Sequence, residues 1–337
     1  MLFLKRSGES PPSLAMVMIV RNEERFLNTH LTYHHLAGID RCYLFLHEST
    51  DQSEEIALRF PWVDVYYLKG EPHPASNYIS EIHRLAMDRA LECARKDGMD
   101  WLLIIDPDEF AFAEPVSGST RANQHKTGFP GLKSLFKGLP DWAMEVRLET
   151  VEAVPTLSSA GEPFYRNEFF VNSDEFCRKI ESVTTGESVE WKGNLGHSEG
   201  QSFVRVNAPV RAYDSHRWTI MQELKPGERP KYIPLPAVSR GEHVHFYIAS
   251  PGHWFEKFSK HNDYPMHWPG EKPTPLEAPV RIWREMIPHI ENDKEKITEL
   301  CKDSVFVADE EIREGLSNRG VVQSVVPRNL IEKSLAQ

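Results

Sequence analysis

Apolar runs and segments with helical periodicity alternate along the first third of the chain. We predict strands at 14–20, 43–46, 63–68 and 101–105, since these short runs are rich in apolar residues. We predict helices from an N-cap at Asn22 to a stop at Gly38, from 53 to 60, and from 79 to a stop at Gly98. Such alternation is typical of an α/β fold with a Rossmann-like, mostly parallel sheet flanked by helices.

The regular alternation of predicted strands and helices ends after residue 112. The segment 114–131 is rich in Gly, Ser, Thr and Pro, which predicts a mobile loop, and 144–148 predicts a further strand. The stretch 280–312 has helical periodicity with a charged outer side. Because we find no repeat and no clear linker, we expect one domain at 13–250 with a helical C-terminal extension at 251–337 packed on it.

Carboxylates follow the strand predicted at 101–105. Asp106, Asp108 and Glu109 lie just past its carboxyl end, where open α/β sheets place their ligands, and Pro107 stiffens the turn. Crowded carboxylates repel one another, and a divalent cation with oxygen ligands makes such crowding tolerable. The alternative interpretation is that these acids only end a strand and cap a turn.

The amino-acid composition excludes several kinds of protein. The 337 residues carry a formal net charge of −11, so a general nucleic-acid binder, which needs a basic surface, is not expected. The four cysteines are widely spaced and suit reduced thiols. The apolar start at 1–6 is too short for a signal peptide, and no run approaches the roughly 20 apolar residues of a membrane span. We expect a cytoplasmic protein without a transmembrane segment, and peripheral membrane contact stays open.

Two segments together resemble one known family. The first is 17–40, with Arg21-Asn22-Glu23-Glu24 after its strand and Tyr33-His34 before Gly38. The second is 101–110, which ends in Asp-Pro-Asp-Glu-Phe. They resemble family 2-like glycosyltransferases, in the subgroup with a Tyr-His-x-x-x-Gly helix end and an Asp-x-Asp-Glu-Phe motif. The resemblance covers 14–112 and continues weakly through 215–218 and 243–247.

The resemblance implies a GT-A fold whose nucleotide-sugar half is 13–112 and whose acceptor half is 113–250. It implies a metal-dependent transfer from a UDP- or GDP-sugar to a saccharide or glycolipid hydroxyl, as in polysaccharide biosynthesis, with the Asp-x-Asp (DXD) motif holding Mn²⁺ or Mg²⁺. A divalent ion suits this reaction because negative charge grows on the diphosphate as it leaves.

The resemblance also implies a metal shell. Asp108 is the expected direct ligand, and Asp106 is expected to face the ribose or a water on the metal. A late histidine, His245 or else His216, is expected to complete the shell. In a strand His243 and His245 share one face, so His243 could support His245 from behind. The alternative is that these histidines are hydrogen-bonded core residues.

Further residues are expected around the donor and acceptor. The expected donor contacts are Asn22, Glu23, Glu48, Asp51, Asp106 and Arg217. Family members commonly carry Asp-Asn-x-Ser-x-Asp after the second strand, but this chain has His47-Glu48-Ser49-Thr50-Asp51 and lacks the first acid. If the reaction inverts the sugar, a carboxylate must remove the acceptor's proton. The candidates are Glu168, Asp174, Glu175 and Asp214.

Two other functions compete with this interpretation. A phosphatase of the haloacid-dehalogenase type also places Asp-x-Asp after a strand, but there the motif usually continues with Gly or Val and then Thr or Ser. Glu109-Phe110 does not fit that continuation. The third hypothesis is a module that binds nucleotide-sugars or glycans without catalysis.

Overall fold

The structure is a computed structural model. It describes residues 10–68, 78–115, 131–154, 156, 163–172, 177–181, 188–192, 200–224, 231–248, 253, 267–268, 272–273, 322–323 and 326–336. Most of the predicted loop at 114–131, from 116 to 130, and the predicted helix at 280–312 lie outside these residues. Among the described helices, none combines the length and the apolar character needed to cross a membrane.

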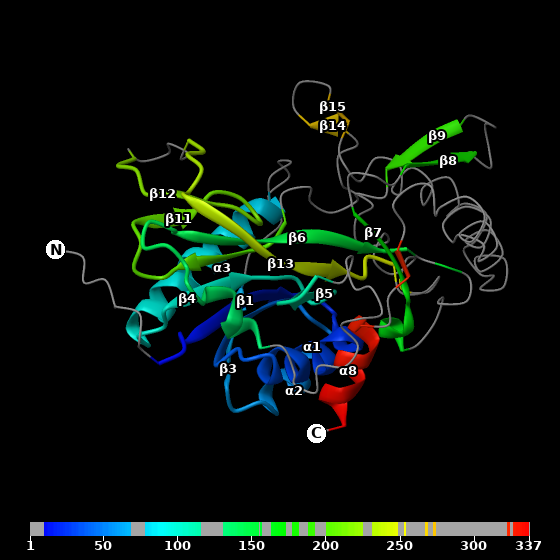
Figure 1. Cartoon of the computed structure of the whole chain (residues 1–337), viewed down its shortest axis with the longest axis horizontal. Helices are drawn as coiled ribbons and strands as arrows, with labels where there is room; N and C mark the ends of the chain where they lie inside the picture. The colour runs from blue at the N-terminus through cyan, green and yellow to red at the C-terminus, as the bar shows by residue number, and fades with distance from the viewer. Residues whose placement is uncertain are drawn as a thin grey trace.

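The first third of the chain forms the parallel part of a large sheet (Figure 1). Its strands are β1 (Leu14–Val20), β2 (Arg41–His47), β3 (Val63–Leu68) and β4 (Trp101–Ile104). They stand in the order β3-β2-β1-β4, and every neighbouring pair is parallel. This is the strand order of a Rossmann half, in which ligands bind beyond the carboxyl ends of the strands.

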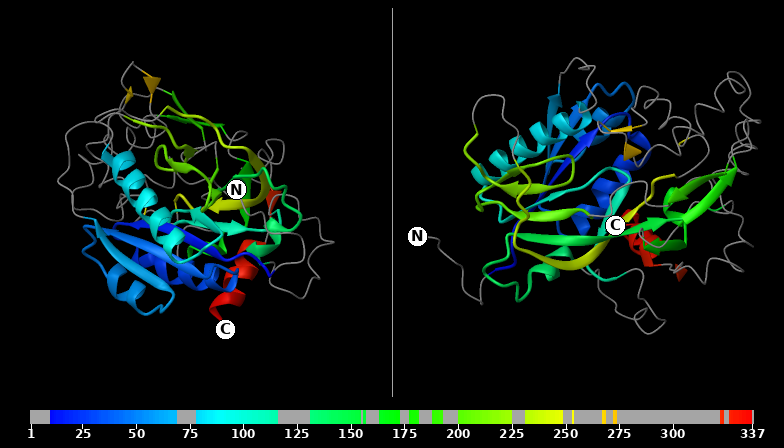
Figure 2. Two further views of the ribbon diagram at one scale, coloured as in Figure 1. Left: turned by 90° about the vertical axis from the view of Figure 1, so that its left-hand side faces the viewer. Right: turned by 90° about the horizontal axis from the view of Figure 1, so that it is seen from above.

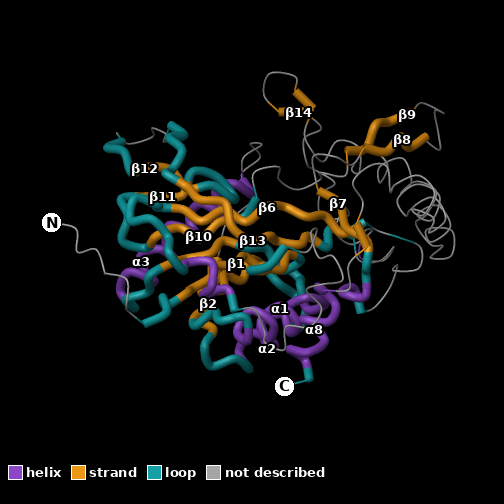
Figure 3. The backbone as a smooth tube through the Cα atoms, in the orientation of Figure 1, coloured by secondary structure: helices purple, strands orange, loops and turns teal. Residues whose placement is uncertain are grey.

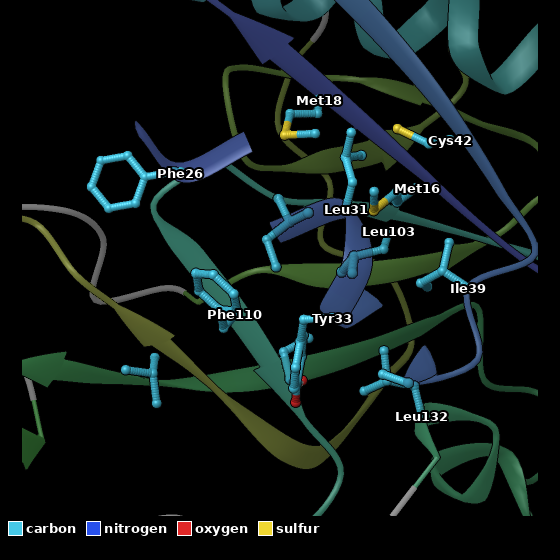
Figure 4. Packing of buried hydrophobic residues seen from close by; sticks show 14 of the residues in the cluster. Met16, Met18, Phe26, Leu31, Tyr33, Ile39, Cys42, Leu103, Phe110 and Leu132 are labelled. Carbon is cyan, nitrogen blue, oxygen red and sulfur yellow. The ribbon is translucent and has the colours of Figure 1, made fainter. Parts of the chain in front are cut away.

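Helices cover both faces of these strands, because side chains of a strand alternate between faces. One face is covered by α1 (Glu24–Leu36) and α2 (Ser53–Leu58), and the other face by α3 (Tyr78–Lys96). Met16 and Met18 of β1 pack with α1 and α2, and Ala15 and Val17 pack with α3. Figure 4 shows Leu31 of α1 beside Met16, and Tyr33 of the same helix beside Phe110. In Figure 2, left, α3 (cyan) lies apart from α1 and α8.

The strands that follow β4 extend the sheet with mixed directions (Figure 3). The added strands are β5 (Glu109–Phe112), β6 (Glu145–Ala153), β7 (Phe169–Asn172), β10 (Ser202–Arg205), β13 (Ala237–His245) and β16 (Val322–Gln323). β10 runs antiparallel to both β4 and β6 and so joins the two parts of the sheet. β13 is parallel to β6 and antiparallel to β5. Among the described residues, these ten strands make one sheet.

Smaller elements surround this sheet. They are η2 (Leu132–Phe136), η3 (Phe164–Arg166), α8 (Val326–Leu335) and the strand pairs β8 (Cys177–Glu181) with β9 (Ser188–Lys192), β11 (Val210–Ala212) with β12 (Trp218–Ile220), and β14 (His267–Trp268) with β15 (Lys272–Pro273). Helix α8 packs beside α1 (Figure 1), and its Ile331 belongs to the same core cluster as Phe26.

The predicted α/β fold with a Rossmann-like sheet is confirmed, but the predicted N-cap is wrong. Helix α1 starts at Glu24 with Glu23 as its N-cap, and Asn22 instead has a left-handed backbone with φ 57°. The Asn22 side chain is used elsewhere, because its Oδ1 accepts the backbone N–H of Thr50 at 2.7 Å. The N–H groups at the start of the helix are capped by residues distant in sequence: Glu23 N–H donates to Ser53 Oγ of α2, and Glu24 N–H donates to Asp51 of the loop before α2.

Candidate active site

The turn after β4 is closed at both ends by Glu109. The Glu109 N–H donates to the Asp106 carbonyl (3.1 Å), and the Asp106 N–H donates to Glu109 Oε2 (3.0 Å). Pro107 stands inside the turn, between the two bonded residues, and its ring fixes one backbone angle, so the turn has little conformational freedom. Asp106 is half-buried, whereas Asp108 and Glu109 are buried. The two aspartates are therefore held at the carboxyl edge of the parallel strands, as the sequence predicts.

Glu109 is the centre of a buried hydrogen-bond network. Gln201 Nε2 donates to Glu109 Oε2 at 2.6 Å, and His243 Nε2 lies 3.4 Å from Glu109 Oε1. Burial raises the pKa of Glu109, but His243 and then His245 more than offset this and lower it to about 2. The ionised carboxylate thus ties the Asp106–Glu109 turn to β13 and to the start of β10.

His245 lies between two carboxylates. Its Nε2 is 3.5 Å from Asp108 Oδ2, and its Nδ1 donates to Glu152 Oε1 at 3.1 Å. Burial lowers the pKa of His245, but the charges of Glu152 and Asp108 raise it well above its usual value. The Phe246 N–H donates to the Asp108 carbonyl (2.8 Å), which fixes the end of β13 against the turn.

His243 shares a face with His245, as expected, but it has another partner. The Gln201 backbone N–H donates to His243 Nδ1 (3.4 Å), which leaves the proton on Nε2, opposite Glu109. The residue behind His245 is instead Glu152 of β6, which the sequence analysis did not single out. Only the parallel pairing of β13 with β6 brings Glu152 beside His245, so no local pattern could have revealed it.

His216, the other predicted late ligand, is joined to Glu109 through the side chain of Gln201. Its Nδ1 accepts from Gln201 Nε2 at 3.0 Å, and its ring is 6.0 Å from that of His83. Burial, followed by His83, lowers the pKa of His216 well below its usual value. His216 is thus linked to the aspartate turn through Gln201, while His245 is placed directly against Asp108.

The Tyr-His pair of α1 holds the strand that follows the aspartates. Tyr33 Oη donates to the Ala111 carbonyl (2.8 Å), and the Ala111 N–H donates to His34 Nε2 (3.2 Å). Ala111 lies in β5, whose other edge pairs with β13. The motif therefore acts as an edge partner that satisfies both backbone groups of Ala111.

The loops after β1 and β2 bind each other. Asp51 Oδ1 accepts the Ser53 N–H and its Oδ2 accepts the Glu24 N–H, both at 3.0 Å, so one carboxylate serves the first turns of two helices. The backbone of Glu48 has φ 51°, and its Oε2 forms an ion pair with Arg21 Nη2 at 3.5 Å. Non-glycine residues with positive φ cluster at functional sites, and both Asn22 and Glu48 occur here.

Two of the four carboxylates predicted as general bases are described, and both are bonded to an arginine. Arg328 of α8 donates to Glu168 at 2.9 Å, and Arg217 Nε donates to Asp214 at 2.6 Å. The Arg217 guanidinium also lies over the Tyr232 ring, 4.9 Å from its centroid. Two further candidates, Asp174 and Glu175, lie outside the described residues.

The aspartate and histidine suit a divalent cation chemically. A carboxylate oxygen and a ring nitrogen, Asp108 Oδ2 and His245 Nε2, face each other and form an O,N donor pair appropriate for Mn²⁺. Within the described part of the chain, no three His, Cys, Asp or Glu side chains already stand in a metal-binding arrangement. Mg²⁺ and Mn²⁺ sites of this kind take further oxygen ligands from the bound substrate and from water.

The chain was compared first with protein families and with curated protein sequences. No protein family model matches the chain. An Arabidopsis thaliana protein named glycosyltransferase-like is 23% identical over 211 residues, which are 55% of this chain and 44% of that protein. The chain therefore spans less than half the length of this curated relative.

Some solved protein structures also resemble the chain, at lower sequence identity. Glucosyl-3-phosphoglycerate synthase from Mycobacterium tuberculosis, solved with Mn²⁺, uridine diphosphate and glucosyl-3-phosphoglycerate, is 14% identical, with 44% of this chain and 50% of that chain covered and a TM-score of 0.27. HddC from Yersinia pseudotuberculosis is 11% identical, with 74% and 99% covered and a TM-score of 0.32.

Proposed function

We propose that the chain is a glycosyltransferase that moves a sugar from a UDP- or GDP-sugar to a saccharide or glycolipid hydroxyl with the help of Mn²⁺ or Mg²⁺. The observation that carries the proposal is the pairing of Asp108 with His245 at the carboxyl edge of the parallel strands, beside a rigid Asp-Pro-Asp turn. The sequence similarity to a glycosyltransferase-like protein supports the same reaction class.

The proposed mechanism assigns each side chain a task. Asp108 Oδ2 and His245 Nε2 would hold the cation, and Asp106 would face the ribose or a water on the cation. The cation, when bound, would stabilise the charge that develops on the leaving diphosphate. The β1 and β2 loops, with Asn22, Glu23, Glu48 and Asp51, would form the nucleoside side of the site, and Arg217 would contact phosphate.

For an inverting reaction, a carboxylate must take the proton of the acceptor hydroxyl. We propose Glu168 and Asp214 as the candidates. Each would have to exchange its arginine partner, Arg328 or Arg217, for the acceptor hydroxyl.

The test of metal-dependent donor use is Asp108→Asn. This change removes the charge of a metal ligand but keeps its shape, so transfer should fall by about 100-fold or more. Thermal unfolding without metal should stay within about 3 °C of the wild type, because the Asp108 backbone contact to Phe246 is kept and Glu152 still pairs with His245. The matched control, Asp141→Asn at an exposed position, should leave transfer unchanged. Full activity of Asp108→Asn, or of the wild type with a chelator, would contradict the proposal.

The same assays separate the competing functions. A glycosyltransferase should show a higher Tm with a UDP- or GDP-sugar plus Mn²⁺ and should transfer the sugar. A haloacid-dehalogenase-type phosphatase would instead hydrolyse a generic phosphoester such as p-nitrophenyl phosphate. A binding module would show the rise in Tm without transfer.

A further inference from the structure

Two parallel strands place a carboxylate directly behind the histidine of the site. β13 and β6 pair in parallel, and in their register His245 stands opposite Glu152. The Glu152 carboxylate accepts from His245 Nδ1 at 3.1 Å, while the other ring nitrogen, Nε2, faces Asp108. Both side chains are buried, His245 with 6% and Glu152 with 3% of their surface exposed. The imidazole is therefore held between two carboxylates, Glu152 at Nδ1 and Asp108 at Nε2.

We propose that Glu152 is the positioning residue of the metal site: it holds the proton on His245 Nδ1 and so presents the Nε2 lone pair to the cation beside Asp108. This inference rests on the proposed function. Metal-binding histidines usually donate their second ring N–H to a carboxylate, which sets the tautomer, fixes the ring plane and strengthens the nitrogen as a ligand. The hydrogen bond from His245 Nδ1 to Glu152 has this form before any metal is bound.

The neighbouring histidine shows that this orientation is specific to His245. His243 lies on the same face of β13, but its Nδ1 accepts from the Gln201 backbone and its Nε2 faces Glu109. Opposite His243 in the parallel register, β6 carries Thr150 rather than a carboxylate. Of these two histidines, only His245 thus combines a carboxylate on Nδ1 with a second carboxylate opposite Nε2.

The experiment measures Mn²⁺ affinity by calorimetry on the full chain, with Mn²⁺ alone and with Mn²⁺ plus UDP. Glu152→Gln keeps the shape of the side chain but replaces the carboxylate, so Mn²⁺ affinity should fall about 10- to 100-fold. Glu149→Gln is the matched control, because Glu149 lies on the same strand, is exposed and bonds to Ser239, and its change should leave Mn²⁺ affinity unaltered. If Glu152→Gln does not fold, Glu152→Asp, which withdraws the carboxylate by one methylene, should show a loss in the same direction.

A double-mutant cycle separates positioning from a structural role or direct ligation. Because Glu152 acts through His245, adding Glu152→Gln to His245→Ala should cause no further loss of Mn²⁺ affinity. Additive losses, or unchanged affinity in the single variant, would overturn the inference and leave the proposed function standing. A wild-type chain that binds no Mn²⁺ with or without UDP would overturn the metal-dependent function, and the inference would fall with it.

Discussion

At the scale of single residues, His34 shows how a buried imidazole can join two elements. Its Nδ1–H donates to the His30 carbonyl one turn earlier in α1 (2.9 Å), and its Nε2 accepts the Ala111 N–H of β5. Each ring nitrogen is therefore used in the role that the neutral imidazole offers. Burial lowers the pKa of His34 from 6.5 to about 4, so the folded protein keeps it neutral.

This neutral state predicts a pH dependence of stability. The folded protein binds the His34 proton more weakly than the unfolded chain, so protonation favours unfolding. The stability owed to neutral His34 is complete above pH 6.5 and is lost as pH falls toward 4, by roughly 3 kcal/mol in total. In urea unfolding at a series of pH values, His34→Gln should reduce the dependence of the free energy of unfolding on pH across this window. An equally steep dependence in the variant would refute the assignment.

At the scale of elements, β13 holds the site together because it pairs with β5 and β6 at once. The register of β13 with β6 shifts between Ser239 and Glu242, and Gly241 in this irregularity has φ 77°. A Cβ added there would lie 2.5 Å from the Phe112 carbonyl oxygen. The close approach of β13 to β5, which places both site histidines, therefore depends on this glycine.

We accordingly expect Gly241→Ala to disturb both stability and the site. The matched control is Gly138→Ala, because Gly138 has φ 64° but no heavy atom within 4 Å of an added Cβ. Gly138→Ala should cost only the backbone penalty, about 1–2 kcal/mol. Gly241→Ala should cost about 1–3 kcal/mol more through the clash and should also weaken Mn²⁺ binding. Equal losses in chemical unfolding would show that β5 and β13 yield without strain.

At the scale of the whole molecule, the described end of the chain belongs to the main core. Ile331 of α8 is fully buried in the cluster that contains Phe26 of α1 and Met16 of β1. Arg328 of the same helix binds Glu168 just before β7. Helix α8 thus packs on α1, although the two helices are about 300 residues apart in the sequence.

Truncation of Ile331 should therefore weaken the whole molecule. Ile331→Ala should lower the free energy of unfolding by about 2–5 kcal/mol, because it opens a cavity in the core. Leu335→Ala, one turn later and 38% exposed, is the control and should change it by about 0.5 kcal/mol or less. Denaturant unfolding monitored by tryptophan fluorescence would measure both, and similar small effects would show that α8 is not part of the cooperative unit.

The local pattern of the sequence determined the strands and helices of the first half, the position of Asp106 and Asp108 past a buried strand, and the shared face of His243 and His245. These features depend on residue propensity and on the periods of strands and helices, which are visible in neighbouring residues. Only the tertiary structure decided the partners. Glu152 lies 93 residues from His245, and its carboxylate reaches the imidazole because β13 pairs in parallel with β6. The Asn22 side chain bonds to the Thr50 N–H, 28 residues away, and Glu109 binds Gln201 and His243, which lie 92 or more residues further along the chain. Such contacts follow from strand order and register, which no local pattern of residues encodes.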